Sequence, residues 1–282
     1  MITWHGADRK SRAVLSYLRG ADHPAKLRLI RGLFGTVFSD GLTVVNDLGA
    51  KLKIRPDDYI ARQILWERHY EGESLALAAK ILADGGVFVD IGANRGLYTC
   101  SLGVLPKVEC IAIEPHARNF VELQENLALN PAVQARLFNL CLSRDRRLLD
   151  LQDFNADNSG TVRVVLDDQP DAGQRHTVSA VSLNEIMTYA RLSRVTLLKI
   201  DVEGYELPVL EGLDWESPAR PANVLAEYTD YVRRTTTHQG KEALLQFFEK
   251  LGYEGFTIRG EPLSEAVSIP ESNAWFKDQR PR

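Results

Sequence analysis

The sequence has 282 residues, of which 44% are hydrophobic and 26% are charged, and its formal net charge is −4. This length suits one large α/β domain, or one domain with an appendage, and allows a core that needs no disulfide or metal. The acidic balance argues against a nucleic-acid partner. Three irregularly spaced cysteines without a C-x-x-C pair argue against a disulfide framework and a zinc site.

The N-terminus and the apolar runs bear on where the protein works. Residues 1–12 are largely polar and lack the apolar stretch of a secretory signal. No run reaches the roughly 18 apolar residues that a membrane span needs. We therefore expect a cytoplasmic protein with no membrane span.

The first 70 residues are predicted to form an N-terminal appendage to a larger domain, residues 71–282. In chain order we expect helices over 11–19 and 24–34, a hairpin of strands 42–46 and 50–54, and a helix from Asp57 or Asp58 to about His69.

From Ser74 onward the pattern becomes an alternation of helices and strands. We expect a helix over 74–82, a strand over 87–91, a helix after Gly96, a strand over 108–113, a helix over 119–129 and a strand over 133–142. Residues 144–181 are polar and rich in turns, which predicts a β-ribbon insertion. The alternation then resumes with a helix over 183–190, a strand over 195–200, a short helix from about Glu206, a strand over 223–227, a helix over 242–251 and closing antiparallel strands over 253–258 and 274–277. Such alternation predicts a doubly wound α/β fold with a mainly parallel sheet.

A glycine turn follows the first buried strand and indicates the class of cofactor. No G-x-x-x-x-G-K-[ST] string occurs, which excludes a P-loop, and Gly92 and Gly96 lack the G-x-G-x-x-G spacing of a dinucleotide site. Asp90, at the strand end, would repel a pyrophosphate but attract the ammonium and sulfonium groups of S-adenosylmethionine. The charge pattern therefore favours the methyl donor.

A second acid supports this reading. Glu114 ends the next strand, about 20 residues beyond the turn, where a carboxylate can accept hydrogen bonds from both ribose hydroxyls. Its alternative is a solvated carboxylate at a strand end. Asn94 is expected to contact the methionine end, whereas Tyr98 would either do the same or pack the helix. The predicted cofactor-binding residues are Asp90, Gly92, Ala93, Asn94, Gly96, Tyr98, Glu114 and Pro115.

The fourth strand supplies the candidate catalytic residues. Lys199, Asp201 and Glu203 alternate along its carboxyl end, so all three lean to one face. We expect them to orient an acceptor, with Asp201 or Glu203 taking its proton. The structural alternative is that Lys199 simply pairs with the acids. A divalent metal held by Asp201, Glu203 and Glu227 is a less favoured alternative, so no metal site is assigned.

Two further patterns bear on the chemistry of the chain. His238 would reach the acceptor pocket only if its polar segment folds inward, and an exposed loop position is favoured. No G-x-S-x-G elbow is present, which removes the commonest hydrolase reading of an α/β chain.

The motifs together resemble those of the FkbM-type methyltransferases. The resemblance rests on residues 87–99, on Ile113-Glu114-Pro115 and on residues 198–206, with support from Asn126 to Asn130 and from the strand ending at Glu227. It covers roughly residues 70–276 and makes 71–282 the S-adenosylmethionine-binding domain. It implies a class I methyltransferase sheet and O-methylation of a sugar, glycan, glycosylated or polyketide hydroxyl.

Two other functions remain open at this point. An N-methyltransferase acting on a small molecule or protein would share the cofactor half, although the absence of an N-P-P-Y-type motif after the fourth strand disfavours nucleobase amines. A non-catalytic binding module would keep the fold, but the intact glycine turn and its acids argue against that reading.

Overall fold

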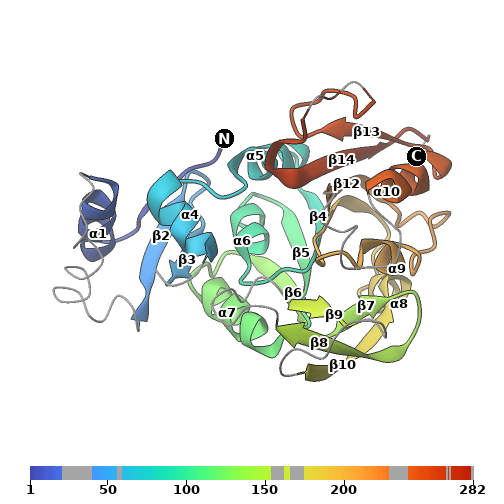
Figure 1. Ribbon diagram of the computed structural model, residues 1–282, viewed down its shortest axis with the longest axis horizontal. Coiled ribbons are helices and arrows are strands. Elements are labelled where there is room, and N and C mark those ends of the chain that lie inside the picture. Colours follow the sequence, from blue (N-terminus) through green and yellow to red (C-terminus); the bar gives the residue numbers. More distant parts are fainter. Residues whose placement is uncertain are drawn as a thin grey trace.

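The computed structural model describes residues 1–20, 40–55, 59–153, 162–165, 175–228, 241–264, 266 and 268–280. Its centre is a seven-stranded sheet with the order β13-β14-β12-β11-β4-β5-β6 (Figure 1). The strands are β4 (Gly86–Ile91), β5 (Val108–Ile113), β6 (Gln134–Phe138), β11 (Val195–Ile200), β12 (Pro221–Glu227), β13 (Tyr253–Thr257) and β14 (Asn273–Asp278). Neighbours from β6 to β12 pair in parallel, and β14 runs antiparallel to both β12 and β13. The predicted doubly wound α/β sheet, with closing antiparallel strands, is confirmed.

The strand order reverses beside β4. Strands β5 and β6 extend from β4 toward one edge of the sheet, whereas β11 and β12 lie on its other side. In a doubly wound sheet, ligands bind outside the carboxyl ends of the strands at such a reversal. The topology therefore directs attention to the ends of β4 and β11.

Helices cover both faces of this sheet. In β4, Phe88 enters one apolar cluster and Val89 the other, and in β11 Leu197 and Leu198 divide in the same way. Buried residues of α5 (Gly72–Ile81) and α6 (Leu97–Gly103) join the first cluster, and those of α8 (Leu183–Tyr189), α9 (Glu206–Leu210) and α10 (Lys241–Lys250) join the second. Strands covered on both faces carry continuous apolar runs, which is why their positions follow from the sequence. Each predicted helix over 74–82, 119–129, 183–190 and 242–251 is present with its ends shifted by one or two residues at most.

The N-terminal part forms a separate three-stranded sheet with the order β1-β2-β3. Its elements are β1 (Trp4–Gly6), α1 (Arg9–Arg19), β2 (Leu42–Asn46), β3 (Lys51–Ile54) and α4 (Tyr59–Glu67). The predicted hairpin is confirmed, and α1 begins earlier than expected because the side chain of Asp8 accepts a hydrogen bond from the Ser11 amide. The predicted helix over 24–34 and the cap at Asp57 or Asp58 lie outside the described residues.

Two asparagines attach this small sheet to the rest of the protein. Asn126 lies in α7 (Ala117–Ala128), and Asn130 lies in the turn that follows this helix. Asn126 Oδ1 accepts from the Lys53 amide at 2.7 Å, and Asn130 exchanges hydrogen bonds with both the amide and the carbonyl of Lys51 at 2.8 and 2.7 Å. Asn126 Nδ2 also donates to the carbonyl of Arg95 in the glycine turn at 2.9 Å. The boundary near residue 70 stays a prediction, although the buried side chains of β1, α1 and β3 share one apolar cluster with α5 and α6.

One predicted strand was wrong in its extent. Residues 133–142 form two strands, β6 and β7 (Cys141–Ser143), with a break at Asn139, whose side-chain amide donates to the carbonyls of Glu114 and Pro115. Strand β7 leaves the central sheet and pairs with β10.

The predicted β-ribbon insertion forms, together with β7, a four-stranded sheet with the order β7-β10-β8-β9. Its other strands are β8 (Arg147–Asp153), β9 (Val162–Val164) and β10 (Arg175–Ser182). Figure 1 shows this sheet beside the carboxyl ends of the central strands. Among the helices of the described ranges, none is long and apolar enough to cross a membrane.

Candidate active site

A cavity of about 280 Å³ opens at the point where the strand order reverses. All but one of the predicted site residues line it: Asp90, Gly92, Ala93, Asn94, Tyr98, Glu114, Pro115, Lys199, Asp201 and Glu203. The exception is Gly96, which has φ of +85° and where a Cβ would lie 2.5 Å from Leu123 Cδ1. Gly96 therefore shapes the turn against α7 without contacting the cavity.

The glycine turn joins the ends of β4 and β11. Gly92 has φ of +78°, and a Cβ there would lie 1.9 Å from the carbonyl oxygen of Asp201. The Asp201 amide in turn donates to the carbonyl of Ile91 at 3.1 Å. The backbone of the fourth strand thus occupies the space that a side chain at position 92 would need.

Asp90 and Lys199 are neighbours across the β4–β11 pair. Asp90 is 1% exposed, and its Oδ2 accepts from the Thr99 hydroxyl at 2.6 Å. Its Oδ1 has no hydrogen-bond partner in the described part of the chain. Burial raises the pKa of Asp90, and the nearby Lys199 ammonium opposes that rise.

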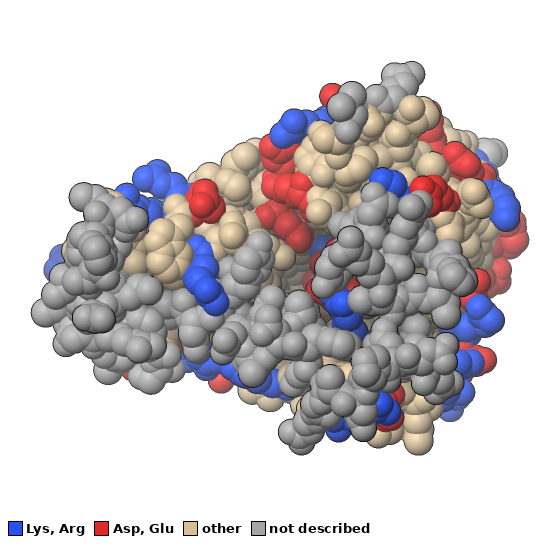
Figure 2. Space-filling model, in the orientation of Figure 1, with Lys and Arg blue, Asp and Glu red and all other residues tan. Residues whose placement is uncertain are grey.

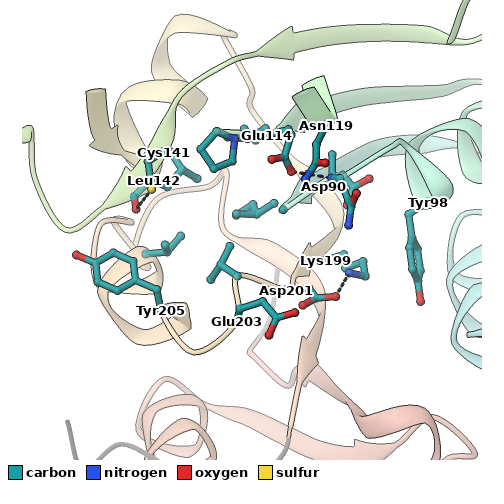
Figure 3. Close-up of a pocket in the computed structure, with 18 of the residues that line it drawn as sticks. Asp90, Tyr98, Glu114, Asn119, Cys141, Leu142, Lys199, Asp201, Glu203 and Tyr205 are labelled. Atoms are coloured by element: carbon teal, nitrogen blue, oxygen red, sulfur yellow. Dashed lines mark hydrogen bonds and ion pairs between the residues drawn. The ribbon is translucent and has the colours of Figure 1, made fainter. Parts of the chain in front are cut away.

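Lys199 lies among acids and against an aromatic ring (Figure 3). Its Nζ is 2.9 Å from Asp201 Oδ2 and 4.7 Å from the centroid of the Tyr98 ring. Burial lowers the pKa of Lys199, but Asp201, Glu71 and Asp90 outweigh it and raise the pKa above its usual value. Lys199 therefore stays charged, and the ion pair expected from the structural alternative is present.

Glu203 projects from a turn with φ of +54°. Arg163 of β9 approaches its Oε2 at 3.2 Å, so the insertion contacts the fourth-strand motif. Burial and the Asp201 charge raise the pKa of Glu203, and Arg163 opposes the rise. Behind this turn, Glu206 Oε1 accepts from the amides of Val202 and Gly204, both at 3.1 Å, which holds the turn in place.

Glu114 is buried rather than solvated, so the alternative of a solvated carboxylate is wrong. Its two oxygens accept from the amides of Asn94 and His116, each at 2.8 Å, and burial raises its pKa to about 7. Asn94 has φ of +49°, and its Oδ1 is buried without a hydrogen-bond partner among the described residues. The second acid thus positions the glycine turn as well as facing the cavity.

The sequence analysis missed much of the remaining lining. The missed residues include Ile60, Tyr70 and Glu71 before β4, Asn119 of α7, Leu140, Cys141 and Leu142 around β7, Leu151 and Val164 of the insertion, and Tyr205 and Val209. For the apolar residues the sequence indicated burial but no role in a site. For Glu71 it indicated only a position ahead of a helix. Tyr205 is held by a contact of 3.1 Å between its hydroxyl and that of Ser143.

The alternative of a metal site gains no geometric support. No group of three His, Cys, Asp or Glu side chains in the described ranges is arranged to hold a metal ion. Burial, followed by the charges of Asp201, Glu206 and Glu203, raises the pKa of Glu227 to about 9. His238 lies outside the described residues.

Comparison with known proteins identifies the family. Residues 90–254 match the profile described as the methyltransferase FkbM domain. The chain belongs to this family. It is a methyltransferase, and the two motifs that carry the resemblance both line one cavity.

Three relatives illustrate the family. The 31-O-demethyl-FK506 methyltransferase FkbM of Streptomyces tacrolimicus is 27% identical over 240 residues, covering 75% of this chain and 86% of that protein. The hexuronic acid methyltransferase AglP of Haloferax volcanii is 24% identical over 179 residues, covering 64% and 70%. The AMB antimetabolite synthetase AmbE of Pseudomonas aeruginosa is 26% identical over 252 residues and covers 77% of this chain, but the match spans only 12% of AmbE.

Proposed function

We propose that this methyltransferase uses S-adenosylmethionine to methylate a hydroxyl group of a sugar, a glycan or a polyketide-type natural product. The observation that carries the proposal is a cavity at the strand reversal, lined by the carboxylates of Asp90, Glu114, Asp201 and Glu203. Such a site is chemically suited to a cationic cofactor and a hydroxyl acceptor.

The lining of the cavity suits this cofactor in charge and in polarity. The buried Oδ1 atoms of Asp90 and Asn94 have no partner among the described residues, and a buried acceptor of this kind needs a donor. An ammonium group supplies one. Glu114 would accept from the ribose hydroxyls, and the apolar side chains of Leu142 and Leu151 suit an adenine ring.

The fourth-strand motif would serve the acceptor. The sulfonium of the bound cofactor supplies an activated methyl group, so the protein mainly has to align the acceptor oxygen with it. Alignment of this kind is worth about 7–11 kcal/mol, and a base adds a factor of about 10²–10⁴. Lys199 stays protonated because of its acidic neighbours, which leaves Asp201 or Glu203 to accept the proton.

Two relatives support the choice of acceptor. The name of the Streptomyces protein specifies an oxygen of FK506, and that of the Haloferax protein specifies a hexuronic acid. Both point toward oxygen-rich acceptors, for which carboxylates are suitable hydrogen-bond partners.

The proposal is tested by calorimetric titration of the protein with S-adenosylmethionine and, separately, with NAD. We expect saturable binding of the methyl donor alone, and a large loss of affinity in Asp90→Asn. Methyl transfer is then measured on a panel of sugar and polyketide hydroxyls, with matched amines beside them. Transfer only to the amines would refute O-methylation, and absence of donor binding by the folded protein would refute the whole proposal.

A further inference from the structure

A glutamate outside the family-matched segment also faces the cavity. Glu71 precedes α5 and lines the cavity with the predicted site residues. The Tyr98 hydroxyl donates to its Oε2 at 2.6 Å. The same tyrosine ring lies against Lys199, so Glu71 extends the group of charged side chains at the ends of β4 and β11.

Glu71 occupies the N-cap position of α5 but does not cap the helix. An acid at that position normally accepts from the first amides of its own helix. Here the carboxylate of Glu271 does so instead, accepting from the amides of Glu73 at 3.0 Å and Ser74 at 2.8 Å. Asn273 reinforces the contact through the Ser74 hydroxyl at 3.1 Å. Because Glu271 caps the helix in its place, the Glu71 carboxylate is available to the cavity.

The backbone around this contact is strained. Glu71, Glu271 and Ser272 have φ of +48°, +53° and +56°, in the left-handed region that residues other than glycine rarely adopt. Strain of this kind persists where surrounding contacts enforce it, and it concentrates at functional sites. Here it places one carboxylate in the cavity and a second one at the end of the helix.

The charges around Lys199 are unbalanced. The charged side chains among the described residues that line the cavity are Glu71, Asp90, Glu114, Asp201, Glu203 and Lys199. Asp90 is almost completely buried, and its Oδ1 lacks a partner within the described ranges. Figure 2 shows acidic side chains gathered in the middle of one face of the molecule. A cationic ligand group would balance this excess of carboxylates.

We propose that Glu71 is a cofactor-binding residue that accepts a hydrogen bond from the α-ammonium group of S-adenosylmethionine. The inference rests on the proposed function and adds to it a residue outside the matched domain. Tyr98, rather than binding the cofactor itself, orients the Glu71 carboxylate through its hydroxyl.

The acid–base state of Glu71 supplies a second readout. Burial raises its pKa to about 7; Lys199 and the Tyr98 hydroxyl oppose this, while Asp201 and Glu271 add to it. Below that pH the free protein holds Glu71 protonated, so binding of an ammonium group has to release the proton. Affinity for S-adenosylmethionine therefore rises as pH increases through about 7.

The test compares two ligands on matched variants by calorimetry at pH 7.5. The ligands are S-adenosylmethionine and 5′-methylthioadenosine, which keeps the nucleoside but lacks the ammonium group. We expect Glu71→Gln to weaken binding of the first about 10- to 100-fold and to leave the second unchanged. Glu73→Gln is the control because its side chain pairs with Arg259 outside the cavity, and it should change neither affinity.

Several outcomes would overturn the inference while the proposed function stands. Equal loss of both ligands in Glu71→Gln would mean a structural role, and unchanged affinities with a lower turnover would place Glu71 on the acceptor. If Glu71→Gln does not fold, the wild-type ratio of the two affinities is measured at pH 6 and 7.5, beside Glu71→Asp. A ratio independent of pH refutes the inference, and failure of the wild type to bind either ligand refutes both proposals.

Discussion

The cavity is enclosed by two walls that differ in chemistry and in origin. The charged wall consists of Glu71, Asp90, Lys199 and Asp201, which come from the ends of β4 and β11 and from the residue before α5. The apolar wall consists of Leu140, Cys141, Leu142, Leu151 and Val164, which come from the four-stranded insertion and the residue before it. Figure 3 shows Asp90, Lys199 and Tyr98 on one side of the cavity and Cys141 and Leu142 on the other.

The two walls are suited to different parts of ligand binding. Buried charges require compensation and therefore fix the orientation of a ligand, whereas an apolar surface gives affinity without direction. Apart from Glu71, the charged wall comes from the ends of two strands of the central sheet. The apolar wall belongs to an insertion, where specificity can change without disturbing the sheet.

The largest expected effect comes from removing the cation of the charged wall. Lys199→Met leaves buried carboxylates without their partner, which we expect to lower the free energy of unfolding by about 3–5 kcal/mol. The pKa values of Asp90 and Glu71 are already raised and would rise further without Lys199. Stability would then be retained at low pH and lost as pH rises, so the loss is larger at pH 8 than at pH 5.5.

Urea denaturation at both pH values measures this effect. Lys53→Met is the control, since Lys53 is on the surface and lies 4.0 Å from Glu125, a pair worth about 0–1 kcal/mol. Equal losses in the two variants would contradict the view that Lys199 compensates the charged wall.

A smaller effect is expected where β4 meets β11. Gly92→Ala combines φ of +78° with a Cβ 1.9 Å from the Asp201 carbonyl, and we expect it to cost about 2–4 kcal/mol. Gly49→Ala is the matched control, because Gly49 has φ of +90° but no atom within 4 Å of the added carbon. Thermal or urea unfolding should show a clearly larger loss for Gly92, and similar losses would mean that the Asp201 backbone moves aside freely.

The smallest expected effect is on ligand affinity, when a side chain of the apolar wall is shortened. Leu151→Ala removes a side chain that is 2% exposed and faces the cavity, at a cost of roughly 1 kcal/mol in binding. Because the nucleoside is common to both ligands, we expect S-adenosylmethionine and 5′-methylthioadenosine to weaken by the same factor. Leu148→Ala, on the same strand and 70% exposed, should change neither. If Leu151→Ala weakened only the binding of S-adenosylmethionine, the proposed difference in role between the two walls would be wrong.

The sequence predicted the central sheet well, and physical reasons explain where it did not. Strands β5 and β11 have the predicted bounds because runs such as Val195–Ile200 are buried on both faces. The break in the predicted strand over 133–142 was not recognised, because it depends on the Asn139 side chain bonding the carbonyls that follow β5. Hydrophobicity shows that a residue is buried but not which of two sheets it joins.

The candidate site was predicted where its residues follow the ends of recognisable buried strands. The acids at the ends of β4, β5 and β11 were recognisable because parallel strands end at one edge. Glu71 was not, because its role depends on Glu271 capping α5 through amides that are 197 and 198 residues away along the chain. For Gly92, the sequence indicated a tight turn but not that the Asp201 backbone occupies the space of a side chain there.

The attachment of β3 to α7 has a consequence for solubility. Strand β3 lies at one edge of the N-terminal sheet, and an exposed edge can recruit strands from other molecules. Asn126 and Asn130 occupy the outward amides of Lys53 and Lys51 and one outward carbonyl. A helix thereby presents side-chain amides where a neighbouring strand would present its backbone. The two asparagines close this edge, so the small sheet can remain on the surface without recruiting strands from other copies.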